Sequence, residues 1–134
     1  MNCPVCKKSM LVLELQQIEI DYCQGCDGIW LDAGELELLL EDTQAKKQLL
    51  DSFSLDRNNP EKPRRCPKCS RKMHKVWVGD GDKKVLIDKC KKDHGIWFDE
   101  GELHDVVELG SVDKQNKVIQ LLNDMFAYKL KTKN

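Results

Sequence analysis

The fold of this chain is decided by the run Cys23-Gln24-Gly25-Cys26-Asp27-Gly28-Ile29-Trp30-Leu31-Asp32-Ala33-Gly34-Glu35-Leu36. It begins with one cysteine pair, and a second pair, Cys3-Pro4-Val5-Cys6, lies sixteen residues upstream. Two such pairs, brought together by a hairpin, supply the four thiolates that tetrahedral zinc prefers. Units of about 60 residues bury only a modest core, so metal binding and folding would be one event. The sequence therefore predicts a zinc site made by Cys3, Cys6, Cys23 and Cys26.

The same pattern occurs a second time along the chain. Cys66-Pro67-Lys68-Cys69 repeats the first pair, and Gly95-Ile96-Trp97-Phe98-Asp99-Glu100-Gly101-Glu102-Leu103 repeats the end of the opening run. The first cysteines of the two copies lie 63 residues apart, whereas Cys23 and Cys90 lie 67 apart. The second copy has therefore gained four residues, which we place in the turn-rich run Gly79-Asp80-Gly81-Asp82 at a hairpin tip.

Each copy is expected to contain a hairpin followed by a helix. Residues 11–15 and 18–22 form strands by their apolar alternation, as do 73–78 and 85–88 in the second copy. Asp32 and Glu35 form a capping box, repeated by Asp99 and Glu102, with Leu31 and Leu36 as its hydrophobic staple. The helices are expected to run from Asp32 to about Ser52 and from Asp99 to about Leu109. Trp30 and Trp97 should pack against the ribbons.

The predicted fold class is a small, metal-stabilised α+β protein. It has two tandem zinc ribbons, each with the order knuckle, β-hairpin, knuckle, then helix, and a C-terminal amphipathic helix follows. The expected division is ribbon 1 with its helix in 1–53, a linker in 54–65, ribbon 2 with its helix in 66–110, and the last helix in 111–134. That last helix would present an apolar stripe of Val118, Leu122, Met125 and Phe126.

The second metal site is less regular than the first. Cys66, Cys69 and Cys90 match three ligands, but Asp93 occupies the position of Cys26, and His94 follows it. We favour His94 as the fourth ligand over Asp93, because imidazole binds zinc better beside thiolates. A weak or empty second site is the remaining alternative there, and for the first site the alternatives to zinc are a rubredoxin-like iron site, a dithiol redox pair and unligated cysteines. His74 and His104 have no cysteine at metal spacing and are not expected to be ligands.

The quoted motifs closely resemble the prokaryotic transcription-factor zinc-finger family, named for its similarity to the zinc ribbon of transcription factor IIB. The resemblance covers nearly all of the first copy and, apart from Asp93 at a cysteine position, the second. It implies a zinc-ribbon fold with ligands at Cys3, Cys6, Cys23, Cys26, Cys66, Cys69 and Cys90. It also suggests a role in transcription or nucleic-acid binding.

Composition limits the compartment and the partners. The chain starts Met1-Asn2-Cys3 without a signal-peptide pattern, and its seven cysteines are an odd number, so a reducing, cytoplasmic location is expected. No apolar run is longer than four residues, such as Met10-Leu11-Val12-Leu13, so no membrane association is expected. With 22 basic and 23 acidic residues, any attraction to nucleic acid must be local.

The second copy carries such a local surplus of positive charge. Residues 61–98 contain 12 basic and 5 acidic side chains, whereas residues 31–60 contain 3 and 7. We therefore predict a non-enzymatic regulatory module that binds nucleic acid or a transcription complex, with Trp77 as the aromatic side chain available for stacking. The proposed phosphate contacts are Arg64, Arg65, Lys68, Arg71, Lys72, Lys75, Lys83, Lys84, Lys89, Lys91 and Lys92.

The alternative function is a protein-interaction adaptor in which zinc is purely structural. Its acidic first helix and its C-terminal helix would then contact a partner or a second copy of the chain. An enzyme is not expected, because the sequence leaves no thiolate free as a nucleophile and a fully ligated zinc has no open position.

Overall fold

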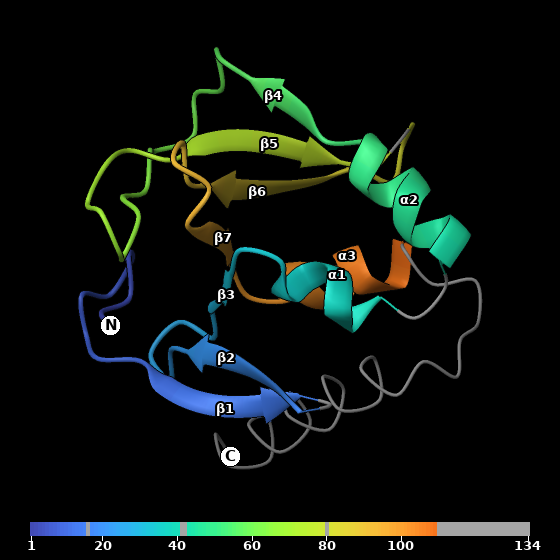
Figure 1. Cartoon of the computed structure of the whole chain (residues 1–134). Coiled ribbons are helices and arrows are strands. Elements are labelled where there is room, and N and C mark those ends of the chain that lie inside the picture. Colours follow the sequence, from blue (N-terminus) through green and yellow to red (C-terminus); the bar gives the residue numbers. More distant parts are fainter. Residues whose placement is uncertain (16, 41–42, 80, 110–134) are drawn as a thin grey trace, which may run out of the picture.

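The computed structural model describes residues 1–15, 17–40, 43–79 and 81–109. Its strands form one seven-stranded antiparallel sheet with the order β1-β2-β3-β7-β6-β5-β4 (Figure 1). The strands are β1 (Leu11–Leu15), β2 (Ile18–Tyr22), β3 (Ile29–Asp32), β4 (Ser54–Asp56), β5 (His74–Val78), β6 (Val85–Lys89) and β7 (Gly95–Phe98). The chain thus has an antiparallel sheet and few helices, as the α+β prediction requires.

The two hairpins differ in the length of their tips. Strands β1 and β2 have the predicted bounds and are separated by residues 16–17, whereas β5 and β6 are separated by 79–84. The second tip is therefore four residues longer, which accounts for the change in spacing between the cysteine pairs. Gly79 needs its φ of 99° there, and a Cβ on it would lie 2.6 Å from the Lys83 carbonyl oxygen.

The two copies meet in the middle of the sheet through strands that were not predicted from the sequence. Strand β3 pairs with β7, and Trp30 lies directly opposite Trp97. The flanking pairs, Ile29 with Phe98 and Leu31 with Ile96, exchange equivalent positions of the two copies. An approximate two-fold axis therefore passes between the two tryptophans, and each copy has a strand between its second knuckle and its helix.

The expected helix from Asp32 to Ser52 is wrong, because the chain forms two shorter helices in that region. Helix α1 covers Glu35–Leu39 and α2 covers Thr43–Asp51, while Leu40 is extended at φ −89° and ψ 120°. The extended backbone allows Leu39 and Leu40, both buried, to enter the same core. Helix α3 covers Glu102–Leu109, where the described residues end.

Each predicted capping box forms only in part: the glutamate bonds as expected, but the aspartate does not. Glu35 and Glu102 each reach back to the backbone amide of the aspartate three residues earlier, at 2.7 Å in both copies. The aspartate side chains do not cap as expected: Asp32 accepts from the Trp30 indole at 2.9 Å, and Asp99 accepts from the Trp97 indole at 3.0 Å. The N-cap of α1 is Gly34 at φ 88°, with no side-chain cap.

Two cores lie on opposite faces of the sheet. On one face the sheet curls around α1 and α3 (Figure 1), and Leu36, Phe98 and Leu103 are buried there. The other core contains Trp30 and Trp97, both fully buried as predicted, together with Met10, Met73 and cysteines of both copies. Alternation along β3 and β7 sends their residues to these two faces.

The predicted linker, 54–65, starts with a strand rather than with irregular chain. Strand β4 adds to the edge of the sheet beside β5, with Leu55 opposite Val76. The predicted C-terminal helix, 111–134, lies outside the described residues. None of the helices in the described part of the chain has the length and apolar character needed to cross a membrane.

Candidate metal centres

The first cluster brings together Cys3, Cys6, Cys23 and Cys26, whose sulfur atoms all lie within 4.8 Å of one another. The Cys3 and Cys26 sulfurs are 3.7 Å apart, far longer than a disulfide bond. Tetrahedral zinc with Zn–S bonds of about 2.3 Å would separate two sulfurs by about 3.8 Å. All seven cysteines are free thiols.

Tight turns position these thiols. In the first three knuckles, the amide four residues after the leading cysteine donates to that cysteine's carbonyl oxygen, from Lys7 at 2.9 Å, Asp27 at 2.9 Å and Ser70 at 2.8 Å. Each donating residue has a positive φ, at 65°, 63° and 64°. In the first knuckle the amides of Val5 and Cys6 also point at the Cys3 sulfur, at 3.3 and 3.2 Å. Such amides stabilise a thiolate.

The second cluster contains Cys66, Cys69, Cys90 and His94. The Cys69 and Cys90 sulfurs are 3.7 Å apart, and His94 Nδ1 lies 3.5 Å from the Cys90 sulfur and 4.0 Å from that of Cys66. Asp93 is not a member of the cluster: its carboxylate is 78% exposed and contacts Lys89 Nζ at 3.2 Å. The structure therefore places His94, not Asp93, beside the three thiols.

A shorter turn explains how His94 can take the place of a cysteine ligand, although it lies one position after Asp93, the residue that aligns with Cys26. In the fourth knuckle the amide of Asp93, only three residues after Cys90, donates to the Cys90 carbonyl at 3.1 Å. The positive φ, 59°, also moves one residue earlier, to Asp93. The turn closes one residue sooner, and the longer imidazole of His94 reaches the place that Cys26 occupies in the first copy.

The donor chemistry and spacing of both clusters fit one zinc ion each, two per chain. Four thiols in one cluster, and three thiols with one imidazole in the other, are donor sets of structural zinc sites. Burial opposes ionisation of Cys23, but the amides of Cys26 and Gly25 and the thiols of Cys3 and Cys26 lower its pKa to about 7. Thiolates are the form that binds the metal, so Cys23 ionises most readily, whereas burial raises the pKa of Cys3 and of Cys26 and metal binding must displace their protons.

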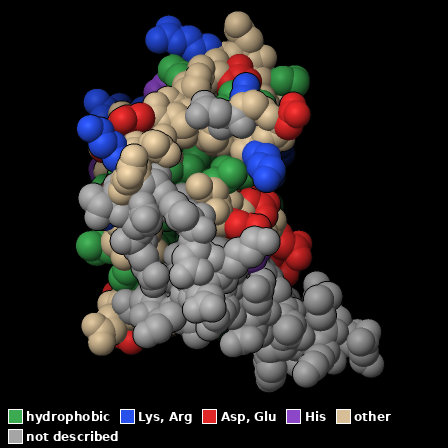
Figure 2. Space-filling model, turned by 90° about the vertical axis from the view of Figure 1, so that its right-hand side faces the viewer, with side chains coloured by type: hydrophobic (Ala, Val, Ile, Leu, Met, Phe, Trp, Pro, Cys, Tyr) green, Lys and Arg blue, Asp and Glu red, His purple; other side chains and the backbone are tan. Residues whose placement is uncertain are grey.

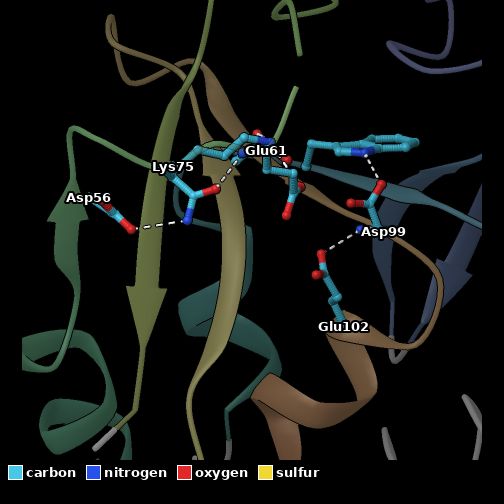
Figure 3. Close-up of polar contacts among 8 residues, drawn as sticks. Asp56, Glu61, Lys75, Asp99 and Glu102 are labelled. Atoms are coloured by element: carbon cyan, nitrogen blue, oxygen red, sulfur yellow. Dashed lines mark hydrogen bonds and ion pairs between the residues drawn. The ribbon is translucent and has the colours of Figure 1, made fainter. Parts of the chain in front are cut away.

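Two other groups of possible ligands lie outside the cysteine clusters. Glu61, Asp88 and Asp99 come together, but Lys75 Nζ lies 2.7 Å from Asp88 and 3.0 Å from Glu61, so an ammonium group already pairs with two of the three carboxylates (Figure 3). His104 contacts Asp105 and Glu108 on α3, at 3.5 and 3.6 Å, on the protein surface. No cysteine takes part in either group.

The structure contradicts the phosphate-binding role proposed for one basic residue, Lys75. Lys75 is 6% exposed and, despite the cost of burial, the carboxylates of Asp88 and Glu61 hold its pKa above the usual value. It is therefore structural. Lys68 is exposed, but its Nζ lies 2.6 Å from Asp32, so it links the second copy to the first. Trp77 is half-buried and donates to Asp56 at 3.0 Å, which restrains the ring.

Comparison with known families agrees with these two clusters. The family model of the transcription factor zinc-finger matches residues 2–42 and 65–109. The chain belongs to this family. The two matched segments correspond to two tandem zinc ribbons, each containing one of the four-residue clusters. No curated protein and no solved structure matches the chain significantly.

Proposed function

We propose that this zinc-ribbon protein is a non-enzymatic regulatory module that binds nucleic acid through the second ribbon, in a reducing compartment such as the cytoplasm. One observation carries the proposal: most of the cations in the second copy have exposed side chains, although the whole chain is nearly neutral. These exposed cations include Arg65, Lys68, Arg71, Lys72, Lys83, Lys84, Lys91 and Lys92. A local surplus of this kind attracts the phosphate backbone.

The opposite charge lies on the helix that follows the first ribbon. Glu35 and Glu37 occupy the first turn of α1, and Lys46 Nζ is bound to the Glu37 carbonyl. On the face drawn in Figure 2, blue Lys and Arg side chains lie in the upper half together with some red Asp and Glu side chains, and further red side chains gather below them. This charge separation would direct a nucleic acid to the second ribbon.

The role proposed for zinc is structural. Each cluster offers four protein ligands, which leaves no open position for a substrate or a reactive water on a tetrahedral ion. The clusters are also packed against the buried Trp30 and Trp97. Zinc would therefore hold the second ribbon in the shape that presents its cations.

The test is binding of fluorescent single- and double-stranded DNA and RNA across a salt series. We expect charge reversal at Lys83, Lys84, Lys91 and Lys92 to weaken binding and to reduce the salt slope, by about 0.7–0.9 for each phosphate that is no longer neutralised. The matched control reverses four lysines of the first copy, Lys7, Lys8, Lys46 and Lys47, and should leave the slope nearly unchanged. Equal effects of both sets, or no binding by the wild type, would contradict the proposal.

A second candidate function, a protein adaptor, is favoured by one feature of α1. Leu38 is 70% exposed and stands in an acidic first helix beside Glu37. Isolated exposed leucines are common, so Leu38 supports an adaptor less strongly than the exposed cations support nucleic-acid binding. Self-association that disappears in Leu38→Ser, measured by sedimentation, together with a flat salt series, would favour the adaptor.

A further inference from the structure

Three basic side chains, which we call the row, lie near one another at one end of the second ribbon. His74 on β5 is directly opposite Lys89 on β6. On the other side of β5, Asp56, the last residue of β4, pairs with Lys75, and Arg57 lies in the turn that follows, near enough for its charge to lower the pKa of His74. Directly opposed residues point to the same face, with Cβ atoms about 5 Å apart. Arg57, His74 and Lys89 therefore come from three distant parts of the sequence to one place.

The surroundings of the imidazole are dominated by positive charge. Partial burial lowers the pKa of His74, and the charges of Lys91, Arg57 and Lys89 lower it further. The acidic group at the row is Asp93, whose carboxylate contacts Lys89 Nζ.

Neighbouring carboxylates on β4 and after it are engaged elsewhere. Asp56 accepts from Trp77 and Asn59, and Glu61 binds Lys75. Trp77 and Lys75 alternate with His74 along β5, so they point to the opposite face of the sheet. The row thus has more positive than negative charge.

The fold itself does not require these charges. The two copies are related by offsets of 63 residues before the hairpin tip and 67 after it. By these offsets, the first copy has Leu11 where the second has His74, Tyr22 where it has Lys89, and Gln24 where it has Lys91. When His74 is protonated, its charge lies opposite that of Lys89, and like charges placed opposite each other destabilise a sheet, a cost that the uncharged row avoids. A binding role accounts for that cost.

We propose that Arg57, His74, Lys89 and Lys91 form an anion site that holds one phosphate group of a nucleic-acid backbone. The proposal rests on the proposed function and assigns it a specific contact, including Arg57 and His74, which charge counting over residues 61–98 does not select. An arginine fork, two ammonium groups and an imidazolium all donate to phosphate oxygens.

Phosphate binding at this site must be linked to protonation of His74. A bound dianion or phosphodiester stabilises the imidazolium, so the bound-state pKa lies above the free value. Affinity is then highest at low pH and falls as the pH rises through the bound-state pKa of His74. His74→Lys should bind with high affinity at every pH in this range. His74→Gln should bind with the lower, high-pH affinity throughout.

The experiment is an NMR titration of the histidine imidazoles of the full, zinc-loaded chain between pH 5.5 and 8. Zinc content is measured at the lowest and the highest pH. Three conditions are compared: chloride, inorganic phosphate, and a single-stranded DNA oligonucleotide whose binding is followed in parallel by anisotropy. We expect the oligonucleotide to raise the pKa of His74 by about half a unit or more. The imidazole resonances of His104, which contacts Asp105 and Glu108 on α3, are the internal control, and adding the oligonucleotide should not change them.

Single-residue variants distinguish binding at this site from general attraction to positive charge. Without ligand, Arg57→Gln and Lys89→Gln should each raise the pKa of His74, because a repelling cation is removed. Each should also weaken oligonucleotide binding about three- to tenfold, whereas Lys47→Gln on α2 should change neither quantity.

The outcomes distinguish the row from the proposed function. If the oligonucleotide binds but His74 does not respond and the variants bind normally, the row is wrong and the proposed function stands. If inorganic phosphate moves His74 while no oligonucleotide binds, the nucleic-acid assignment of the row and the proposed function both fail. A response of His74 to the oligonucleotide that is lost in Arg57→Gln supports both.

Discussion

Gly28 of the first copy lies directly against the Trp97 ring of the second, so closely that a Cβ on Gly28 would be 2.1 Å from Trp97 Cζ2. The relationship is reciprocal, because a Cβ on Gly95 would be 2.6 Å from Trp30 Cζ2. Each ribbon therefore buries its tryptophan on the glycine backbone of the other. The glycine before each Ile-Trp pair is needed for contact between the copies.

Gly28→Ala should strongly destabilise the protein, by roughly 2–3 kcal/mol, because the methyl group and the Trp97 ring cannot both fit. Denaturant unfolding followed by tryptophan fluorescence measures this. Gly101→Ala is the comparison: Gly101 has φ 81°, but a Cβ there meets nothing within 4 Å, so it should cost only about 1 kcal/mol. In the double variant with Trp97→Phe the two losses should be less than additive, and strict additivity would exclude the contact as the cause.

His94→Ala should release zinc from the second cluster, while Asp93→Ala should not. The imidazole lies 3.5 Å from the Cys90 sulfur, whereas the Asp93 carboxylate points to Lys89 and solvent. Zinc transfer to a colorimetric chelator gives the rates, and His94→Ala should release one of two ions much faster than the wild type. Faster release from Asp93→Ala than from His94→Ala would reverse the ligand assignment.

Much of this site could be predicted from the sequence, because cysteine spacing and hairpin alternation are local signals. The bounds of β1 and β2, the longer second tip and the proximity of His94 to the thiols all follow from such signals. The pairing of β3 with β7 does not, because it joins segments 67 residues apart and Gly-Ile-Trp locally resembles the entry to a helix. Gly95 and Gly28 were the signals available, since each must accommodate a ring from the other copy.

The break between α1 and α2 shows a different limit of sequence reasoning. Helical periodicity continues from Leu36 through Leu40. Burial of Leu40 in an extended conformation nevertheless stabilises the fold more than another turn of helix would. Asp42 and Thr43, residue types that often start helices, were a signal for the second start. The buried role of Lys75 was hidden for a related reason: its partner Asp88 is identified only by cross-strand register.

Lys75→Met should destabilise the protein by about 3 kcal/mol, because it leaves the buried Asp88 carboxylate without its ammonium partner. The same change should leave the salt slope of nucleic-acid binding unaltered, since Lys75 does not reach solvent. Lys83→Met, at an exposed position of the hairpin tip, should show the reverse pattern. Urea unfolding and the salt series measure the two effects, and a reduced slope for Lys75→Met would contradict the structural role.

Glu102 gives the stability a defined pH dependence. Burial, with the nearby charges of Asp99, Asp88 and Glu61, raises its pKa from 4.5 to about 7, although it accepts from the Asp99 amide. A raised carboxyl pKa favours the folded state at low pH, and this contribution is lost as the pH rises from about 4.5 to about 7.

Relative to Glu102→Gln, which keeps the acceptor oxygen, the wild type should therefore lose about 1–2 kcal/mol of stability between pH 5.5 and 8, after allowance for partial exposure. Comparing the two proteins at each pH cancels any common effect of zinc release. Parallel stability curves for wild type and variant would show that Glu102 does not titrate in this range.

The most direct test of the two-zinc scheme is the zinc content of the chain, measured by native mass spectrometry on protein purified under reducing conditions. Two four-ligand clusters, one with four thiols and one with three thiols and His94, predict two zinc ions per chain, held together on one core around Trp30 and Trp97. A main species with two zinc ions agrees with this scheme. A single ion would remove the second centre, and a protein that folds without zinc would contradict the scheme as a whole.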